Sequence, residues 1–204
     1  MLPLLLEERP AARTELVPLT VEQYHRMIAA AILEEGDPIE LLDGMLVTKD
    51  RGPGTTVHPL HSAVVTKLLL LATRLTAFGC HLRSQTALTI RPRHEPEPDA
   101  AIIRGRPGDC AQRHPEPADV SCVVEVADGS LERDRTTKLR IYATAGIPQY
   151  CLIDLRDRRI ELYEDPDRER GAYGDRRELA PEATVDLLLP DGRRFEVAAA
   201  DLLP

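Results

Sequence analysis

The stretch from residue 120 to 155 constrains the fold more than any other part of the chain. It opens with VSCVVEV, an almost continuously apolar run rich in β-branched residues. Such a run is typical of a central strand that is covered on both faces. One charged residue, Glu125, interrupts it. A carboxylate buried in a strand costs several kcal/mol, so a cation, a metal ion or a proton must compensate it.

The helix expected after this strand supplies a partner for that carboxylate. Ser130 is suited to be its N-cap, and the helix should run to about Ala145, because Gly146 follows. Lys138 falls within the apolar stripe of this helix, on the side that faces the sheet. The sequence therefore predicts that Glu125 and Lys138 meet, either as a structural ion pair or as part of an active site.

Composition limits the classes of protein that this chain can be. At 204 residues, with 43% hydrophobic and 29% charged residues, it suggests one soluble globular domain with a sizeable core. The net charge of -8 argues against a generally basic surface for nucleic acid, and the 3% of aromatic residues offers few stacking platforms. A local acidic site stays compatible with DNA, because bound metal ions offset its charge.

The cysteines and the N-terminus predict the compartment. Cys80, Cys110, Cys122 and Cys151 show no CxxC spacing, which favours a reduced cytoplasmic protein without structural zinc. The leucine run near the N-terminus is too short for a signal core and lacks preceding basic residues. We also expect no membrane span, because we see no apolar stretch of about 18 residues.

The remaining patterns predict a mixed α/β domain with a central sheet flanked by helices. The expected elements are a helix over 20–36, a hairpin over 39–47, a long buried helix over 59–78, strands over 81–90, 99–103, 150–154 and 159–164, a polar loop over 165–177, and a hairpin over 184–197. The predicted division is an N-terminal arm (1–18), a main domain (19–164) and a C-terminal β-hairpin extension of the same domain (165–204).

Asp99 and Glu125 are the strongest candidates for chemistry. Both lie in or at the ends of predicted buried strands. Two converging carboxylates repel unless a divalent cation lies between them, and their hard oxygens suit magnesium or manganese. Lys138 beside them could orient or activate water and stabilise charge on a phosphate. Alternatively, Asp99 caps a strand and Glu125 forms a structural pair with Lys138; spacing alone does not decide between these interpretations.

Three further polar residues are weaker candidates. Asp134 precedes Lys138 by four residues, a good ion-pair spacing, and could orient the lysine or act as a helix-start carboxylate. Arg135 could contact solvent or phosphate, although a structural role is the more frequent one for residues such as Asp134 and Arg135. Gln85 could line the site from the strand before Asp99, although a plain polar residue on a sheet face is the favoured interpretation.

An ordered set of motifs carries a resemblance to a known family. The motifs are LTVEQY, IELLDGMLV, HSAVV, EPDAAII, VVEV, DRTTK and IYATAGIPQYCLID, spread over residues 19–163. Each is weak alone, but together and in this order they are specific. The chain resembles the Uma-two family of restriction endonucleases within the PD-(D/E)XK nuclease superfamily. The resemblance implies a restriction-endonuclease-like fold, a mixed central sheet flanked by helices.

The resemblance also assigns roles to residues. The family's metal-binding Asp and Glu fall on Asp99 and Glu125. The superfamily lysine usually stands two residues after that Glu, where this chain has Ala127. The next helix supplies the lysine in this family, and Lys138 matches that position.

Two more residues match family positions that support the site. Glu40 matches an acidic residue of the first hairpin that resembles an additional metal-site carboxylate. His61 matches a family histidine, for which a phosphate contact or a supporting role is expected. Cys151 departs from the usual family Trp, at a position better suited to packing than to chemistry.

The resulting expectation is a magnesium- or manganese-dependent endonuclease that acts on double-stranded DNA in the cytoplasm. A homodimer would suit the cutting of both strands, although no residue demonstrates one. The alternative is a non-catalytic DNA- or protein-binding module that retained the nuclease fold. The acidic pI near 5.3 favours that alternative slightly, whereas the intact set of acids and lysine disfavours it.

Overall fold

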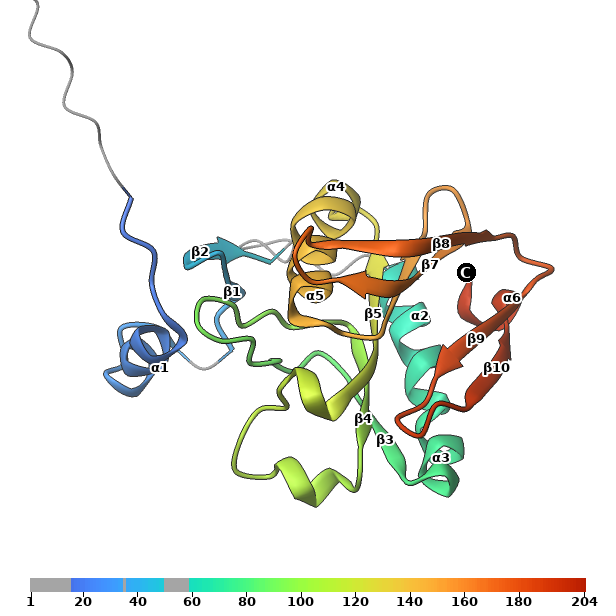
Figure 1. Ribbon diagram of the computed structural model, residues 1–204, viewed down its shortest axis with the longest axis horizontal. Helices are drawn as coiled ribbons and strands as arrows, with labels where there is room; N and C mark the ends of the chain where they lie inside the picture. Colours follow the sequence, from blue (N-terminus) through green and yellow to red (C-terminus); the bar gives the residue numbers. More distant parts are fainter. Residues whose placement is uncertain (1–15, 35, 50–58) are drawn as a thin grey trace, which may run out of the picture.

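A six-stranded mixed sheet forms the centre of the molecule, with strand order β3-β4-β5-β6-β7-β8 (Figure 1). The structure is a computed structural model, and it describes residues 16–34, 36–49 and 59–204. Most of the predicted N-terminal arm, residues 1–15, therefore lies outside the described residues. The predicted fold class, a mixed central sheet flanked by helices, is confirmed.

The bounds of the elements are as follows. The strands are β1 (Ile39–Leu42), β2 (Met45–Thr48), β3 (Cys80–Arg83), β4 (Ala100–Arg104), β5 (Val120–Ala127), β6 (Gln149–Asp154), β7 (Arg159–Asp167), β8 (Ala172–Leu179), β9 (Thr184–Leu188) and β10 (Arg194–Ala198). The helices are α1 (Val21–Ala29), α2 (Pro59–Leu70), α3 (Ala72–Leu75), α4 (Leu131–Arg133), α5 (Leu139–Ala145) and α6 (Ala199–Leu202), with a π-helical turn, η4 (Asp134–Lys138), between α4 and α5.

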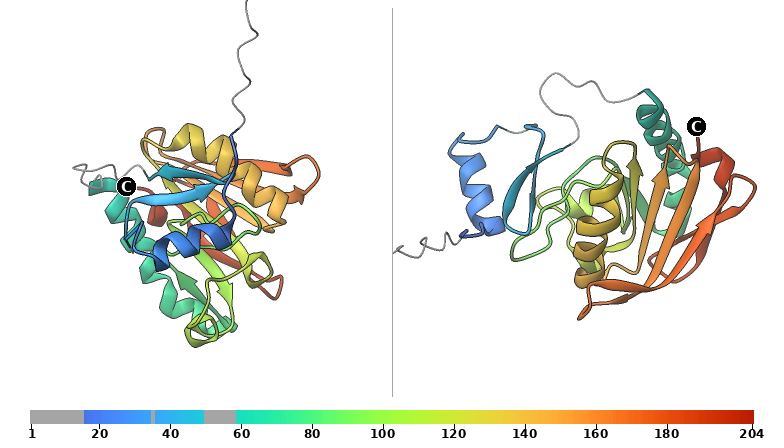
Figure 2. Two further views of the ribbon diagram at one scale, coloured as in Figure 1. Left: turned by 90° about the vertical axis from the view of Figure 1, so that its left-hand side faces the viewer. Right: turned by 90° about the horizontal axis from the view of Figure 1, so that it is seen from above.

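The sheet is covered on both faces, as the composition of β5 predicted. Helices α2 and α3 and the β9–β10 hairpin pack on one face, and α5 packs on the other (Figure 2). Successive residues of a strand point to opposite faces. Val124 and Val126 therefore belong to the core under α2, whereas Val123 and Ala127 belong to the core under α5. Glu125 lies on the same face as Val123 and Ala127, so its side chain is directed to the α5 side.

The predicted strand over 81–90 is too long. β3 ends at Arg83, and Gln85 adopts a left-handed backbone with φ of 51°. The amide of Leu88 donates to the carbonyl of Pro96, so this segment pairs with its own returning loop rather than with a neighbouring strand. The first helix is also shorter than predicted: it ends at Ala29, and Ala31 then has a positive φ of 52°.

The predicted polar loop over 165–177 is wrong, because β7 and β8 form a hairpin there. Oppositely charged side chains pair diagonally across the two strands: Arg177 lies 2.9 Å from Glu164, and Arg159 pairs with Glu178. Such cross-strand pairs stabilise a hairpin without alternating apolar residues. Residues 165–177 therefore lack the alternation of apolar and polar residues by which a strand is predicted from sequence.

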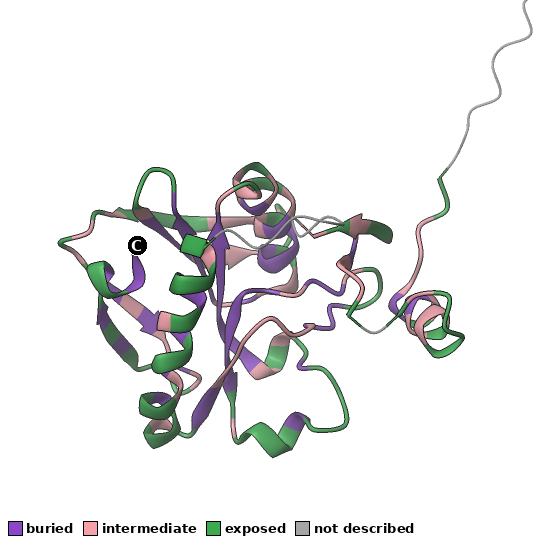
Figure 3. Cartoon of the chain, turned by 180° about the vertical axis from the view of Figure 1, so that it is seen from behind, coloured by how far each residue is buried: buried purple, intermediate pink, exposed green. Residues whose placement is uncertain are grey.

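The long helix is less buried than predicted. Residues 59–78 continue through α2 and α3, yet only 28% of their most apolar window is buried, and Leu70 is 70% exposed. Figure 3 shows the exposed side of α2 beside the buried β5. By length and composition alone this segment could cross a membrane, contrary to the expectation from the sequence. Its buried side, with Val64 and Leu68, packs on the sheet as a core helix does.

Candidate functional site

The register of the sheet brings Asp99 and Glu125 to one place. In the antiparallel ladder between β4 and β5, Ala100 lies opposite Val124. Asp99, one residue earlier, is therefore across from Glu125, one residue later. The register therefore brings Asp99 and Glu125 to the same end of neighbouring strands. The carboxylate of Glu125 lies on the α5 side, whereas that of Asp99 contacts β5 through the amide of Val126 and α2 through His61.

Lys138 joins this pair from the helical segment that follows β5. Its Nζ donates a hydrogen bond of 2.9 Å to Oε1 of Glu125 and lies 3.1 Å from Oε1 of Glu40. Glu40 comes from β1, and its Oε1 also accepts a 2.8 Å hydrogen bond from the backbone amide of Glu97. All three charged side chains are buried. The predicted meeting of Glu125 and Lys138 is confirmed.

Asp99 is held by one side chain and one amide. Nε2 of His61, at the start of α2, lies 3.0 Å from Oδ1, and the backbone amide of Val126 donates to Oδ2 at 2.8 Å. Burial disfavours the ionised form, yet these contacts outweigh it and lower the pKa of Asp99. His61 therefore supports an ionised Asp99.

The cluster has more negative charge than its lysine compensates. Burial raises the pKa of Glu125 well above its usual value, even though Lys138 acts in the opposite direction. Oε2 of Glu40 is buried and has no hydrogen-bond partner among the described residues. A buried, unpaired carboxylate oxygen is costly. The site is therefore electrostatically suited to a further proton or cation.

The π-helical turn changes the predicted relation of Asp134 to Lys138. Both side chains are buried, and within the described part of the chain the ion pairs of Lys138 are with Glu125 and Glu40. Oδ1 of Asp134 has no hydrogen-bond partner in the same residues, and burial raises the pKa of Asp134. π-turns occur often at functional sites. The role of Asp134 as an orienter of the lysine stays a prediction.

Gln85 approaches the site through its backbone. Its amide points to the carbonyls of Pro98 and Asp99, at 3.1 and 3.2 Å. Its role as a lining residue also stays a prediction. Tyr142, which the sequence analysis did not select, donates a 2.7 Å hydrogen bond to Oε1 of Glu125. The signal was its position one turn after Lys138, in the same apolar stripe.

Arg135 belongs to an ion-pair network. Its guanidinium lies 3.0 Å from Asp154 and also pairs with Glu161, and neither acid is accessible to solvent. Asp154 on β6 and Glu161 on β7 accept hydrogen bonds from its guanidinium. These contacts support a structural role for Arg135, whose side chain is 32% exposed, and a phosphate contact stays a prediction.

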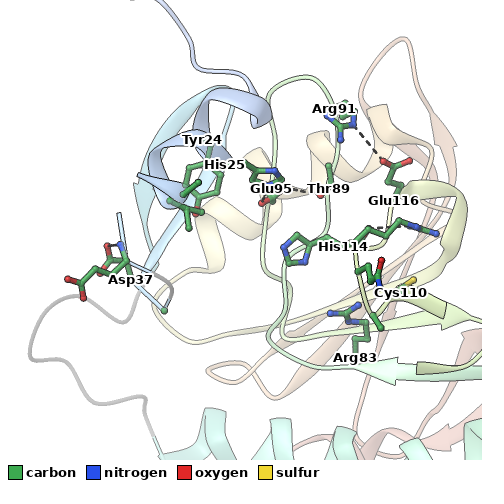
Figure 4. Close-up of a pocket in the computed structure, with 17 residues that line it drawn as sticks. Tyr24, His25, Asp37, Arg83, Thr89, Arg91, Glu95, Cys110, His114 and Glu116 are labelled. Carbon is green, nitrogen blue, oxygen red and sulfur yellow. Dashed lines mark hydrogen bonds and ion pairs between the residues drawn. The ribbon is translucent and has the colours of Figure 1, made fainter. Parts of the chain in front are cut away.

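A separate cavity of about 740 Å³ lies between α1 and the segment at 110–116 (Figure 4). Nε2 of His25 is 2.7 Å from Oε1 of Glu95, and Thr89 donates to Oε2 of the same carboxylate at 2.8 Å. Arg91 pairs with Glu116 at 3.6 Å. These charged groups already partner one another, and none of the carboxylate and lysine side chains of the candidate site lines this cavity.

Comparison with known proteins agrees with the fold and the motifs. A family model described as "Putative restriction endonuclease" matches residues 21–198. A solved structure of a "putative nuclease belonging to DUF820" from Anabaena variabilis ATCC 29413 is similar, with a TM-score of 0.65 and 16% identity, over 91% of this chain and 97% of that one. No curated protein matches the chain. The chain belongs to the family of that model, Uma2.

Proposed function

We propose that this protein is a metal-dependent endonuclease that hydrolyses phosphodiester bonds of DNA with magnesium or manganese. One observation carries the proposal: the strand register brings Asp99 and Glu125 to the same end of β4 and β5, and the amine of Lys138 reaches Glu125 from the following helical segment. Acids for a hard cation, with a fixed positive charge beside them, are the groups that metal-assisted phosphodiester hydrolysis requires.

The donor set fits such an ion. No three His, Cys, Asp or Glu side chains of the described residues stand in an arrangement that could hold a metal. Magnesium, however, usually takes one or two carboxylates and completes its shell with water and substrate phosphate. Asp99 and Glu125 would supply the two carboxylates. The buried, unpartnered Oε2 of Glu40 adds negative charge that such an ion would offset.

The residues of this chain divide the chemistry between them. A bound ion would polarise the phosphoryl group and offset its charge. Burial disfavours the charged form of Lys138, but Glu125 and Glu40 outweigh that effect and raise its pKa. Lys138 therefore stays protonated, so it donates hydrogen bonds to water or to a phosphate and does not act as a base. His61 orients Asp99.

A non-catalytic binding module is the rival, and one contact favours it. The amine of Lys138 lies within ion-pair distance of both Glu40 and Glu125, so it offsets part of their charge without a metal ion. As a nuclease, the protein would act on double-stranded DNA in the cytoplasm. A homodimer would present two sites to the two strands.

The decisive experiment is cleavage of plasmid and of single- and double-stranded oligonucleotides across several divalent ions. We expect the wild type to cut with magnesium or manganese, and Asp99→Ala to lose cleavage while its thermal unfolding stays close to that of the wild type. Asp175→Ala, at an exposed acid of β8, is the matched control and should cut normally. Equal cleavage by wild type and Asp99→Ala would contradict the proposal.

Calorimetry separates the nuclease from the rival. Manganese binding that disappears in Glu125→Gln supports the enzyme, because the substitution removes a ligand and keeps the shape of the side chain. Absence of any binding by the wild type supports the binding module.

A further inference from the structure

Tyr142 makes a contact whose consequence extends beyond packing. Its side chain is fully buried on α5, and its hydroxyl donates to Oε1 of Glu125 at 2.7 Å. The same oxygen accepts the 2.9 Å hydrogen bond from Lys138. Two donors from one face of a helical segment therefore fix a single oxygen of the proposed metal ligand.

Tyr150 and Tyr173 satisfy their hydroxyls without a carboxylate, whereas Tyr163 in the same ring cluster donates to Glu161. Tyr142 packs against Tyr150, with ring centroids 5.3 Å apart, and Tyr150 in turn stacks on Tyr173 at 6.4 Å. Tyr150 donates to the backbone carbonyl of Asp134, and Tyr173 to that of Ile147. Within this cluster, backbone carbonyls satisfy both of those hydroxyls. Tyr142 instead uses the side chain at the candidate site.

We propose that Tyr142 is a positioning residue: together with Lys138 it holds Oε1 of Glu125, so that Oε2 is presented to the divalent cation. This inference rests on the proposed function, because it concerns how that site binds its metal. The phenol is held in place as a donor, because its ring is fully buried and packs against Tyr150. Groups that orient a metal ligand commonly contribute 10- to 100-fold to metal affinity or activity.

The test measures manganese binding by titration calorimetry and by the electron paramagnetic resonance signal of free manganese. The proteins are wild type, Tyr142→Phe and Tyr173→Phe. Each variant removes one hydroxyl from the same ring cluster, but of the two tyrosines only Tyr142 donates to Glu125. We expect Tyr142→Phe to bind manganese about 10- to 100-fold more weakly. Tyr173→Phe should bind as the wild type does.

A merely structural role predicts a different pattern. If Tyr142→Phe and Tyr173→Phe weaken binding equally, or if Tyr142→Phe binds as tightly as the wild type, the inference is overturned. Cleavage against manganese concentration adds a second readout: saturating metal should return kcat of Tyr142→Phe to within a few-fold of the wild type. A wild type that binds no manganese refutes the proposed function itself, whereas the variants test Tyr142 only when the wild type binds.

Discussion

Two clusters of buried charge flank the same helical segment, and they differ in how completely they are satisfied. The site cluster consists of Glu40, Asp99, Glu125 and Lys138, whereas the arginine cluster consists of Arg135, Asp154 and Glu161. The cation of each cluster, Lys138 or Arg135, comes from the π-helical turn η4. Their composition alone does not distinguish them.

Hydrogen bonding does distinguish them. In the arginine cluster, Oδ1 of Asp154 accepts from the amides of Arg156 and Asp157, and Oδ2 accepts from Arg135. Glu161 accepts from Arg135 and from the Tyr163 hydroxyl. Although burial acts against it, these donors lower the pKa of Glu161.

In the site cluster, by contrast, burial raises the pKa of Glu125, and a buried oxygen of Glu40 lacks a partner among the described residues. A saturated cluster holds the fold together, and a cluster with unsatisfied negative charge is suited to an additional cation. The comparison can be tested by substituting matched residues on the two sides.

The largest expected difference is in cleavage. Glu125→Gln should reduce metal-dependent cleavage at least about 100-fold, because it removes a charge from the reaction centre. Glu161→Gln, the same change in the arginine cluster, should leave cleavage within a few-fold of the wild type. Plasmid cleavage at saturating metal measures both. Similar losses in the two variants would remove the distinction between the clusters.

Stability should respond in the opposite order. Glu161→Gln should lower the free energy of unfolding by about 2 kcal/mol, because charged hydrogen bonds to a guanidinium are replaced by weaker ones. Glu125→Gln should lower it less at neutral pH, because burial disfavours the charged form of Glu125 and Lys138 keeps Glu40 as an ion-pair partner. Urea denaturation at fixed pH measures both. A larger loss in Glu125→Gln would identify the site cluster as structural.

The pH dependence of stability should have opposite signs in the two clusters. The lowered pKa of Glu161 stabilises the fold above its unfolded value of 4.5, and this contribution is lost as the pH falls through the folded pKa. The raised pKa of Glu125 favours the fold below 4.5, and that contribution is lost as the pH rises through the folded value. Urea titrations at a series of pH values give the free energy of unfolding as a function of pH. In Glu161→Gln this free energy should depend less on pH in the acid range, and in Glu125→Gln it should depend less on pH near neutrality. Unaltered slopes in both variants would refute this assignment.

The smallest effect is expected for an exposed pair. Arg159 and Glu178 pair across the β7–β8 hairpin, with side chains 38% and 45% exposed. Arg159→Ala should change the free energy of unfolding by less than about 1 kcal/mol, because solvent screens such pairs. Urea denaturation beside Glu161→Gln makes the measurement. A loss as large as that of Glu161→Gln would show that burial does not set the value of a charge in this sheet.

Local sequence patterns determined the centre of this protein. The apolar run around Glu125 predicted the buried strand β5, and the spacing after Ser130 predicted a helical segment that carries Lys138 toward the sheet. Both predictions depend on near neighbours in the chain, where periodicity and capping are strong signals. The ordered motifs also indicated the family that the comparison confirmed.

Only the tertiary structure decided which charges are satisfied. Glu40 reaches Lys138 from a hairpin almost a hundred residues earlier, Arg135 turns to Asp154 and Glu161, and charged residues pair β7 with β8. These outcomes depend on strand register and on a π-turn that shifts side chains around the helix axis. Local periodicity predicts neither the strand register nor the π-turn, because contacts between distant segments depend on how the whole sheet assembles.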